Sequence, residues 1–219
     1  MKIFVAGSGK LANAILISGL TIPFCEILKW EPQHQSIHER AILVHAGSGR
    51  QLNECMAFCS GSKSVFIELA TGLNTEKMEV DFPLIICPNT SLLVLKTLHM
   101  VQKSSMHFKN YEISITESHQ ATKKTEPGTA YAFAAALDFP SIRIESIRDP
   151  EIQLNKIGIP REFLEKHAYH KIVMKDGNDE IVVETKVLGH QAYAQGIKSI
   201  VEMIFKNTNL KIKNIRFLI

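Results

Sequence analysis

Side chains that bind anions and move protons gather between residues 117 and 130. His119 is followed four positions later by Lys123, in a segment with almost nothing to bury. An imidazole, whose unperturbed pKa is about 6.5, suits proton transfer near neutral pH, and an ammonium group suits a carboxylate. Gly128 and Thr129 begin an expected helix, where backbone N–H groups and a hydroxyl offer a second anion cradle. The stretch indicates a pocket for a small anion that also receives a proton, although a lone His-x-x-x-Lys is more often surface chemistry.

A glycine turn near the N-terminus indicates a dinucleotide site. Gly7-x-Gly9-x-x-Ala12 follows an apolar strand over 2–6 and opens a helix over 9–20. The first glycine permits a tight turn, and the second lets the backbone approach a pyrophosphate at the helix N-terminus. The alternative is a tight turn with no ligand. The cofactor contacts expected here are Gly7, Gly9, Lys10 and Leu11.

An acidic residue about 20 positions further on binds the adenosine ribose in such folds. Glu31 lies 22 residues beyond Gly9 and favours NADH, whereas Lys29 suits the 2′-phosphate of NADPH, so both cofactors stay open. Glu31 is equally well explained as a solvated loop acid. His45 ends an apolar strand, where a buried structural histidine is the commoner case.

Alternating strands and helices predict the fold class. The first part reads as an α/β, Rossmann-like parallel sheet domain, and the second as an α+β domain on a mixed or antiparallel sheet. We expect residues 1–88 plus 190–219 to bind the dinucleotide, and residues 89–189 to bind substrate and support oligomerisation. Expected strands cover 2–6, 24–30, 41–45, 65–69, 84–87, 111–116, 142–147, 170–175, 180–188 and 210–218; expected helices cover 9–20, 51–59, 92–100, 129–137 and 191–205.

Composition excludes several classes of protein. The 219 residues are 45% hydrophobic with a formal net charge of +3, which gives a core but no polyanion-binding signature, so no nucleic-acid partner is expected. No apolar run approaches the ~18 residues of a membrane span, and because an expected strand begins at residue 2, no signal peptide is expected. We therefore expect a cytoplasmic protein without a membrane partner. Its four cysteines lack zinc spacing and are expected to be reduced thiols, and no metal site is expected.

The stretch around His119 resembles one family. Glu-Ser-His119-Gln120-Ala-Thr-Lys123, followed by Pro127-Gly128-Thr129-Ala130, is similar to the substrate motif of the dihydrodipicolinate reductases, Glu-x-His-His-x-x-Lys-x-Asp-Ala-Pro-Ser-Gly-Thr-Ala. Further pieces follow in the family's order. They are the N-terminal glycine turn, Ala70-Thr71-Gly72 for a Thr-Thr-Gly turn, Pro88-Asn89-Thr90-Ser91 for an Asn-(Phe/Met)-Ser segment, and Gly189 to Gly196 for the terminal helix region.

The resemblance implies residue roles. His119 matches the proton donor, and Lys123 matches the lysine that holds substrate and assists protonation. Gln120, Gly128 and Thr129 match substrate-binding positions. The implied cofactor positions at the later turns are Ala70, Thr71, Gly72, Pro88 and Asn89. The implied reaction is NADH- or NADPH-dependent reduction of a cyclic, imine-containing dicarboxylate, 4-hydroxy-tetrahydrodipicolinate, in lysine and diaminopimelate synthesis, by a homo-oligomer that is usually a tetramer.

Several positions depart from the family pattern. Gln120 replaces the second histidine, and Thr125-Glu126-Pro127-Gly128 is one residue shorter and lacks the serine. Two alternatives therefore stay open. One is another NAD(P)-dependent imino- or amino-acid oxidoreductase. The other is a dinucleotide-binding protein that has lost catalysis.

Overall fold

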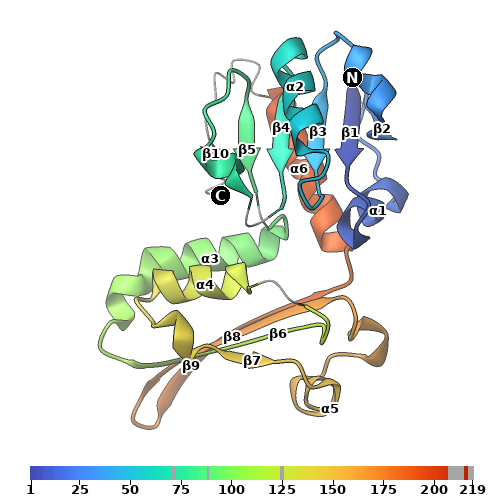
Figure 1. The fold of residues 1–219 in the computed structure, drawn as a ribbon. Helices are drawn as coiled ribbons and strands as arrows, with labels where there is room; N and C mark the ends of the chain where they lie inside the picture. Colours follow the sequence, from blue (N-terminus) through green and yellow to red (C-terminus); the bar gives the residue numbers. More distant parts are fainter. Residues whose placement is uncertain (71–72, 88, 124–125, 207–214, 217–219) are drawn as a thin grey trace. The chain divides into compact units, whose positions relative to one another are not determined.

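The computed structural model describes residues 1–70, 73–87, 89–123, 126–206 and 215–216. The chain divides into two compact units. The first comprises Met1–Thr90 and Tyr193–Leu218, and the second comprises Ser91–Ala192. The predicted α/β class, with a Rossmann-like parallel sheet and a second unit on a mixed sheet, is confirmed (Figure 1).

The first unit is built on a parallel sheet in the order β10-β5-β4-β3-β1-β2. The strands β1, β3 and β4 are almost entirely buried, because they are apolar runs covered on both faces. The order places β1 between β2 and β3, which is the switch point where open α/β sheets bind ligands. The strands are β1 (Lys2–Ala6), β2 (Glu26–Lys29), β3 (Ile42–His45), β4 (Val65–Glu68), β5 (Leu84–Ile86) and β10 (Ile215–Arg216).

Helices cover the two faces of this sheet with separate cores. Val5 and its same-face neighbours pack with Ile15 of α1 and Ile200 of α6, while Phe4 packs on the other face with Phe58 of α2. Figure 1 shows α2 and α6 on opposite faces of the sheet. The helices are α1 (Lys10–Ile17), α2 (Leu52–Ser62) and α6 (Gln191–Lys206), with short 3-10 turns η1 (Pro32–Ser36) and η2 (Asn74–Lys77).

A close backbone contact joins the two chain segments of the first unit. A Cβ at Gly196 of α6 would lie 1.7 Å from the Thr90 carbonyl oxygen, so only glycine fits there. The Thr90 hydroxyl also donates to the Tyr193 carbonyl oxygen at 2.8 Å. The returning helix is therefore held where the chain leaves the first sheet.

The second unit has a four-stranded sheet in the order β7-β6-β8-β9. β6 pairs parallel with β7 and antiparallel with β8, and β8 pairs antiparallel with β9. Ile115 and Ile172 face helix α4 at Phe133 and form the core of the unit. The strands are β6 (Glu112–His119), β7 (Glu145–Ile147), β8 (His167–Asp176) and β9 (Asp179–Leu188). The helices and turns are α3 (Leu92–Ser104), η3 (Ser105–Phe108), α4 (Gly128–Ala136), η4 (Ser141–Arg143), α5 (Pro150–Ile152), η5 (Gln153–Ile157) and η6 (Arg161–Phe163).

Several predicted elements differ in extent from the structure, and one lies largely outside the described residues. The strand expected over 111–116 continues to His119, because pairing with β8 runs on to Ala168. The strand expected over 142–147 begins with the 3-10 turn η4 and keeps only three strand residues. The helix expected over 9–20 ends at Ile17. Of the strand expected over 210–218, only β10 lies among the described residues.

Candidate functional site

A histidine–carboxylate pair ends strand β6. Glu117 and His119 are two residues apart on a strand and therefore point to the same face. The His119 Nδ1 lies 2.7 Å from Glu117 Oε2, with the glutamate side chain fully buried and the histidine side chain 14% exposed. The buried Glu117 carboxylate therefore holds Nδ1 of the imidazole, and the opposite edge of the ring faces outward.

Arg148 holds the second oxygen of the same carboxylate. Its Nη2 donates to Glu117 Oε1 at 2.6 Å, and its Nη1 donates to the Ile147 carbonyl oxygen at 2.9 Å. The parallel pairing of β6 with β7 sets Glu117 opposite Ser146 and so brings Arg148 within reach. Burial raises the pKa of Glu117, but hydrogen bonds from His119, Arg148 and Ser146 outweigh it and lower the pKa to about 2.

Lys123 lies close to this pair through a tight turn. The Lys123 backbone N–H donates to the Gln120 carbonyl oxygen at 3.0 Å, directly after β6. Burial lowers the pKa of the half-buried Lys123 ammonium, the Glu117 carboxylate raises it, and the Arg148 guanidinium lowers it further. The predicted His119 and Lys123 are therefore brought into one electrostatic neighbourhood with two residues that the sequence did not single out.

Gln153 fixes the backbone beneath the pair. Its side-chain amide donates to the His119 carbonyl oxygen at 2.7 Å and to the Ile147 carbonyl oxygen at 3.2 Å. The residue is 1% exposed and comes from the π-helical turn η5. It ties the ends of β6 and β7 together, which fixes the position of His119 along the sheet.

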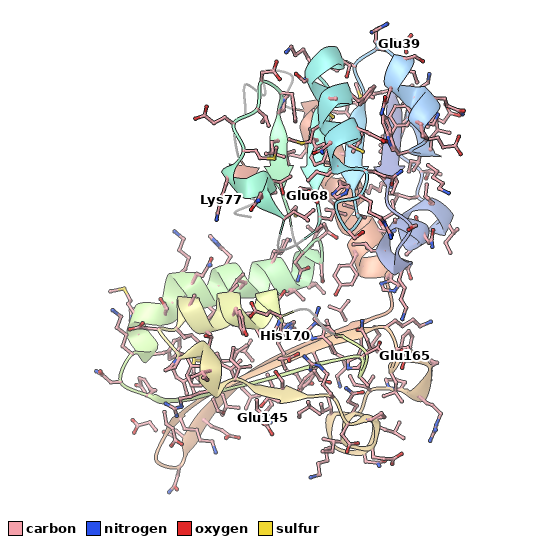
Figure 2. The ribbon with its side chains drawn as sticks, viewed as in Figure 1. Glu39, Glu68, Lys77, Glu145, Glu165 and His170 are labelled. Carbon is pink, nitrogen blue, oxygen red and sulfur yellow. The ribbon has the colours of Figure 1, made fainter. Side chains whose placement is uncertain are left out.

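A second histidine lies across the sheet from Glu117. His170 of β8, which is labelled in Figure 2, pairs in register with Glu117 and is 1% exposed. Its Nδ1 lies 3.0 Å from the Thr185 hydroxyl. Its ring contacts that of His119 edge-on, with centroids 5.9 Å apart. Burial, followed by the nearby His119, lowers the pKa of His170 to about 3, against an opposing contribution from Glu117. Its Nε2 has no hydrogen-bond partner in the described structure.

The predicted anion cradle lies at the start of helix α4. Gly128 is the first residue of α4, and Thr129 is half-buried beside it. The Gly128 N–H already donates to the Glu126 carbonyl oxygen at 3.0 Å, which differs from the free amide expected at this position. Gln120 is half-buried at the turn after β6. Binding of substrate by these residues stays a prediction.

The glycine turn of the first unit has the geometry that a diphosphate needs. Gly7 has φ +129°, and a Cβ there would lie 2.5 Å from the Ala46 carbonyl oxygen. Gly9 caps α1 in an extended conformation, and a Cβ there would meet nothing within 4 Å. Lys10 and Leu11 are the first residues of α1. A tight turn that opens onto a helix N-terminus fits a dinucleotide diphosphate.

Glu31 is engaged locally. It caps the 3-10 turn η1 with its side chain, and its Oε2 accepts from the Gln33 amide at 2.9 Å. Both interpretations of Glu31, as a ribose ligand and as a loop acid, are compatible with this capping role.

A second histidine–glutamate pair lies at the carboxyl ends of β3 and β4. His45 Nδ1 and Glu68 Oε1 are 2.7 Å apart, with side chains 1% and 0% exposed, and the Ala70 N–H donates to the same oxygen at 2.9 Å. His45 Nε2 and Glu68 Oε2 have no partner within the described structure. Asn89 accepts from the Cys87 thiol at 3.1 Å. The predicted cofactor residues Thr71, Gly72 and Pro88 lie outside the described residues.

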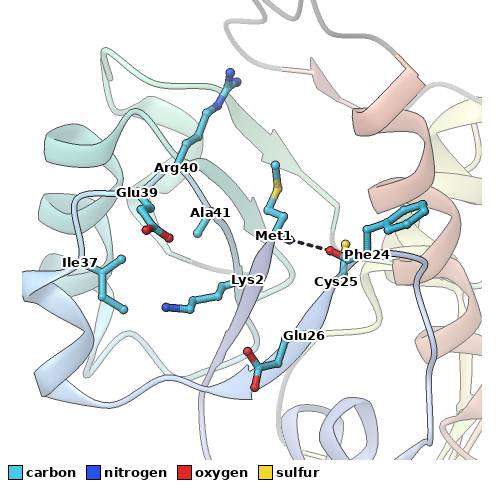
Figure 3. A pocket seen from close by; sticks show the side chains of 9 residues that line it. All are labelled: Met1, Lys2, Phe24, Cys25, Glu26, Ile37, Glu39, Arg40 and Ala41. Carbon is cyan, nitrogen blue, oxygen red and sulfur yellow. Dashed lines mark hydrogen bonds between the residues drawn. The ribbon is translucent and has the colours of Figure 1, made fainter.

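A hollow of about 440 Å³ lies at the opposite end of the first sheet. Figure 3 shows it around the start of β1, between the segments that lead into β2 and β3, with the N-terminal amine of Met1 donating to the Phe24 carbonyl oxygen at 2.6 Å. Open α/β sheets bind ligands at the carboxyl ends of their strands, so we assign no ligand to this hollow. It is lined by Met1, Lys2, Phe24, Cys25, Glu26, Ile37, Glu39, Arg40 and Ala41.

The described residues contain neither a membrane-spanning helix nor a metal-binding cluster. No described helix has both the length and the hydropathy to cross a membrane. Among the same residues, no cluster of three or more histidine, cysteine or acidic side chains is arranged to hold a metal ion. The four cysteines are free thiols.

Sequence reasoning missed Arg148, Gln153 and His170 and gave Glu117 no role. The period of a strand was signal enough for Glu117, because it shares a face with His119. Strand pairing brings Arg148 to the site and a π-helical turn brings Gln153, and no local sequence pattern predicts either contact.

Comparisons of sequence identify relatives of the second unit. The family model described as "Dihydrodipicolinate reductase, C-terminus" matches residues 94–215, more than half of the chain. A protein of Oryza sativa subsp. japonica named "Probable 4-hydroxy-tetrahydrodipicolinate reductase 2, chloroplastic" is 36% identical over 96 residues, which cover 41% of this chain and 30% of that protein. "4-Hydroxy-tetrahydrodipicolinate reductase 1, chloroplastic" of Arabidopsis thaliana is 31% identical over 111 residues, or 48% and 32% of the two chains. The matches therefore span about a third of these relatives.

A comparison of structures extends the likeness to both units. A dipicolinate-bound dihydrodipicolinate reductase from Paenisporosarcina sp. TG-14 matches with a TM-score of 0.66 and 14% identity, over 94% of each chain. A probable dehydrogenase from Thermotoga maritima matches with a TM-score of 0.55 and 7% identity, over 94% of this chain and 89% of that one. At these identities the likeness is one of fold.

Proposed function

Because this chain belongs to the dihydrodipicolinate reductase family, we propose that it reduces 4-hydroxy-tetrahydrodipicolinate to tetrahydrodipicolinate with NADH or NADPH. The observation that carries the proposal is the group formed by Glu117, His119 and Lys123 at the end of β6. It places a proton carrier beside a cation, which is what reduction of a cyclic dicarboxylate requires. The step belongs to lysine and diaminopimelate synthesis.

The first unit is the proposed site of the cofactor. Gly7, Gly9 and the start of α1 would hold the diphosphate, and the strand ends that carry Ala70 and Asn89 would lie beside the nicotinamide. When bound, the reduced nicotinamide supplies a hydride, and the protein contributes orientation and charge. The choice between NADH and NADPH rests on Glu31 and Lys29 and is decided by measurement.

The second unit is the proposed site of the substrate. Lys123 pairs with one carboxylate, and the start of α4 at Gly128 and Thr129 receives the other. Hydride adds to the electrophilic carbon of the unsaturated ring, and the proton that the reduced carbon skeleton then takes up comes from His119. Before the hydride step, the hydroxyl leaves as water together with a hydrogen from the neighbouring ring carbon, so the reaction as a whole consumes one hydride and one proton.

The first test removes the two side chains. We expect His119→Ala and Lys123→Ala each to lower kcat about 100-fold, since loss of one transition-state donor costs about 2.7–4 kcal/mol. The assay follows NADH and NADPH separately with enzymatically generated 4-hydroxy-tetrahydrodipicolinate. His38→Ala, at an exposed histidine of the first unit, is the matched control and keeps the wild-type kcat. Near-normal kcat in both site variants would remove the roles assigned here.

Gln120 motivates one alternative substrate class. Where the family motif has a second histidine, this chain has a neutral amide, which hydrogen-bonds a carboxylate without adding charge. A panel of cyclic and acyclic imino acids, assayed with both cofactors, separates reduction of the family substrate from another imino- or amino-acid oxidoreductase. We also propose a homo-oligomer on family grounds, to be measured by light scattering.

A further inference from the structure

Two hydrogen bonds connect His119 to a residue far outside its own motif. Glu117 lies between His119 and Arg148, with one carboxylate oxygen on each, at 2.7 and 2.6 Å. The carboxylate is fully buried, so it has no solvent to replace either partner. Arg148 is itself fixed by its bond to the Ile147 carbonyl oxygen. The three side chains form one chain of contacts from β7 to the exposed edge of the imidazole.

We propose that Arg148 is a positioning residue for the reaction, acting through Glu117 to hold His119 with its Nδ1 proton inward and its Nε2 outward. This inference rests on the proposed function, since it concerns the proton donor of that reaction. An ionised carboxylate only accepts, so the nitrogen facing Glu117 carries the proton. The partner of one ring nitrogen decides what the other nitrogen does, as in other histidine–carboxylate arrangements.

Arg148 is needed because Glu117 alone is not held in place. A buried carboxylate without a charged partner on its second oxygen is costly, whereas a guanidinium there balances its charge and fixes its plane. The Arg148 guanidinium balances the charge of Glu117 in this way. Arg148 is 27% exposed, which leaves it reachable from solvent but committed by both of its terminal nitrogens.

Gln153 fixes the backbone that carries His119. Its amide holds the His119 carbonyl oxygen and the Ile147 carbonyl oxygen together. The backbone of the proton donor and that of the residue before Arg148 are therefore bound to one side chain. A site that fixes both the ring and its backbone has the pre-organisation that proton transfer requires.

The test combines kinetics with the tautomer of His119. In nitrogen-15 NMR of the wild-type protein, neutral His119 shows the Nδ1–H form. We expect Arg148→Gln to convert it to a mixture with the Nε2–H form and to lower kcat about 10- to 100-fold, with KM for the cofactor unchanged. Arg148→Lys restores part of kcat. Arg143→Gln, at an exposed arginine that lies over the Phe139 ring, is the matched control and changes neither readout.

Three results would overturn the inference. The first is an Nε2–H tautomer of neutral His119 in the wild-type protein. The second is Arg148→Gln with the wild-type tautomer and kcat. The third is a rise in KM for the dicarboxylate with kcat and tautomer unchanged, which would make Arg148 a substrate ligand. If the wild-type protein reduces none of the substrates, the proposed function fails, but the tautomer in wild type and Arg148→Gln still decides the positioning role.

Discussion

The two units each contain a histidine–glutamate pair with the same 2.7 Å contact, and the surroundings of the pairs differ. In the first unit, His45 and Glu68 are both buried, and each keeps one atom without a partner in the described structure. In the second, Glu117 is buried with both oxygens bonded, while His119 reaches solvent. A contact distance alone therefore does not assign a role.

The difference lies in what balances the carboxylate. Glu117 has a guanidinium on its second oxygen, so the balance of its charge does not depend on the imidazole. Glu68 has the imidazole and one backbone donor, so His45 is committed to it. We infer that the first pair mainly stabilises the fold and the second mainly serves the reaction. The predictions below test this contrast.

The largest expected effect follows removal of His45. His45→Leu leaves Glu68 buried with the Ala70 amide as its hydrogen-bond donor, and breaking a buried pair costs about 3–5 kcal/mol of unfolding free energy. His119→Leu costs about 1 kcal/mol or less, because Arg148 still pairs with Glu117. The single tryptophan, Trp30, lies in the first unit and reports urea unfolding there by fluorescence, and hydrogen exchange reports on β6.

A double variant checks the cause of that loss. His45→Leu combined with Glu68→Leu removes the buried charge together with its partner, and replacement of a buried pair by apolar side chains is often neutral. We expect the double variant to recover most of the stability that the single variant loses. Equal losses at His45 and His119 would mean that their surroundings do not separate the two pairs.

The next largest effect is the acid dependence of Glu117. Its pKa in the folded protein, about 2, lies below the value of about 4.5 taken for an unperturbed glutamate, so the unfolded chain binds the proton more readily. The stabilisation is therefore present above about pH 5 and is lost as the pH falls toward 2, by roughly 3 kcal/mol in total. Hydrogen exchange across this range measures it.

Glu117→Gln isolates this contribution. The variant has no carboxyl group to titrate at residue 117, so its stability falls less than that of the wild-type protein between pH 5 and pH 2. Glu112→Gln, at an exposed position on the same strand, is the matched control and keeps the wild-type acid dependence. Parallel curves for the wild type and Glu117→Gln would show that hydrogen bonds do not hold this carboxyl ionised.

The sequence predicted the parts of this contrast that depend on local pattern. The two-residue spacing of Glu117 and His119 is the local signal that puts both on one face of β6, and alternating strands and helices predicted the parallel sheet. His45 was correctly expected to be a buried histidine, because it ends an apolar strand. These inferences need only neighbours within a few residues.

The sequence did not predict the parts that depend on long-range pairing. Arg148 meets Glu117 because β7 pairs parallel with β6 in one register, 29 residues away, and that register has no local signal. Gln153 reaches His119 only because a π-helical turn replaces an ordinary helix after Pro150. Glu68 was read as part of an apolar strand, since nothing in its own segment shows that His45 lies opposite.

The smallest expected effect concerns the protonation of His170, an imidazole with no carboxylate contact at its nitrogens in the described structure. Its pKa of about 3 lies below the usual value of about 6.5, so the unfolded chain binds this proton more readily. The stability that depends on neutral His170 is present above pH 6.5 and falls by about 2 kcal/mol between pH 7.5 and pH 5.

His170→Leu removes the contribution of His170 to the dependence of stability on pH. Loss of the contact to Thr185 lowers the stability of the variant by the same amount at every pH, so only the difference between the two pH values is informative. Hydrogen exchange in β8 measures it, with His38→Leu as the exposed control. A variant slope equal to that of the wild type would mean that His170 already takes up its proton in the folded protein. A protonated His170 would add a second positive charge beside Glu117, and Arg148 would then not be needed to balance the carboxylate.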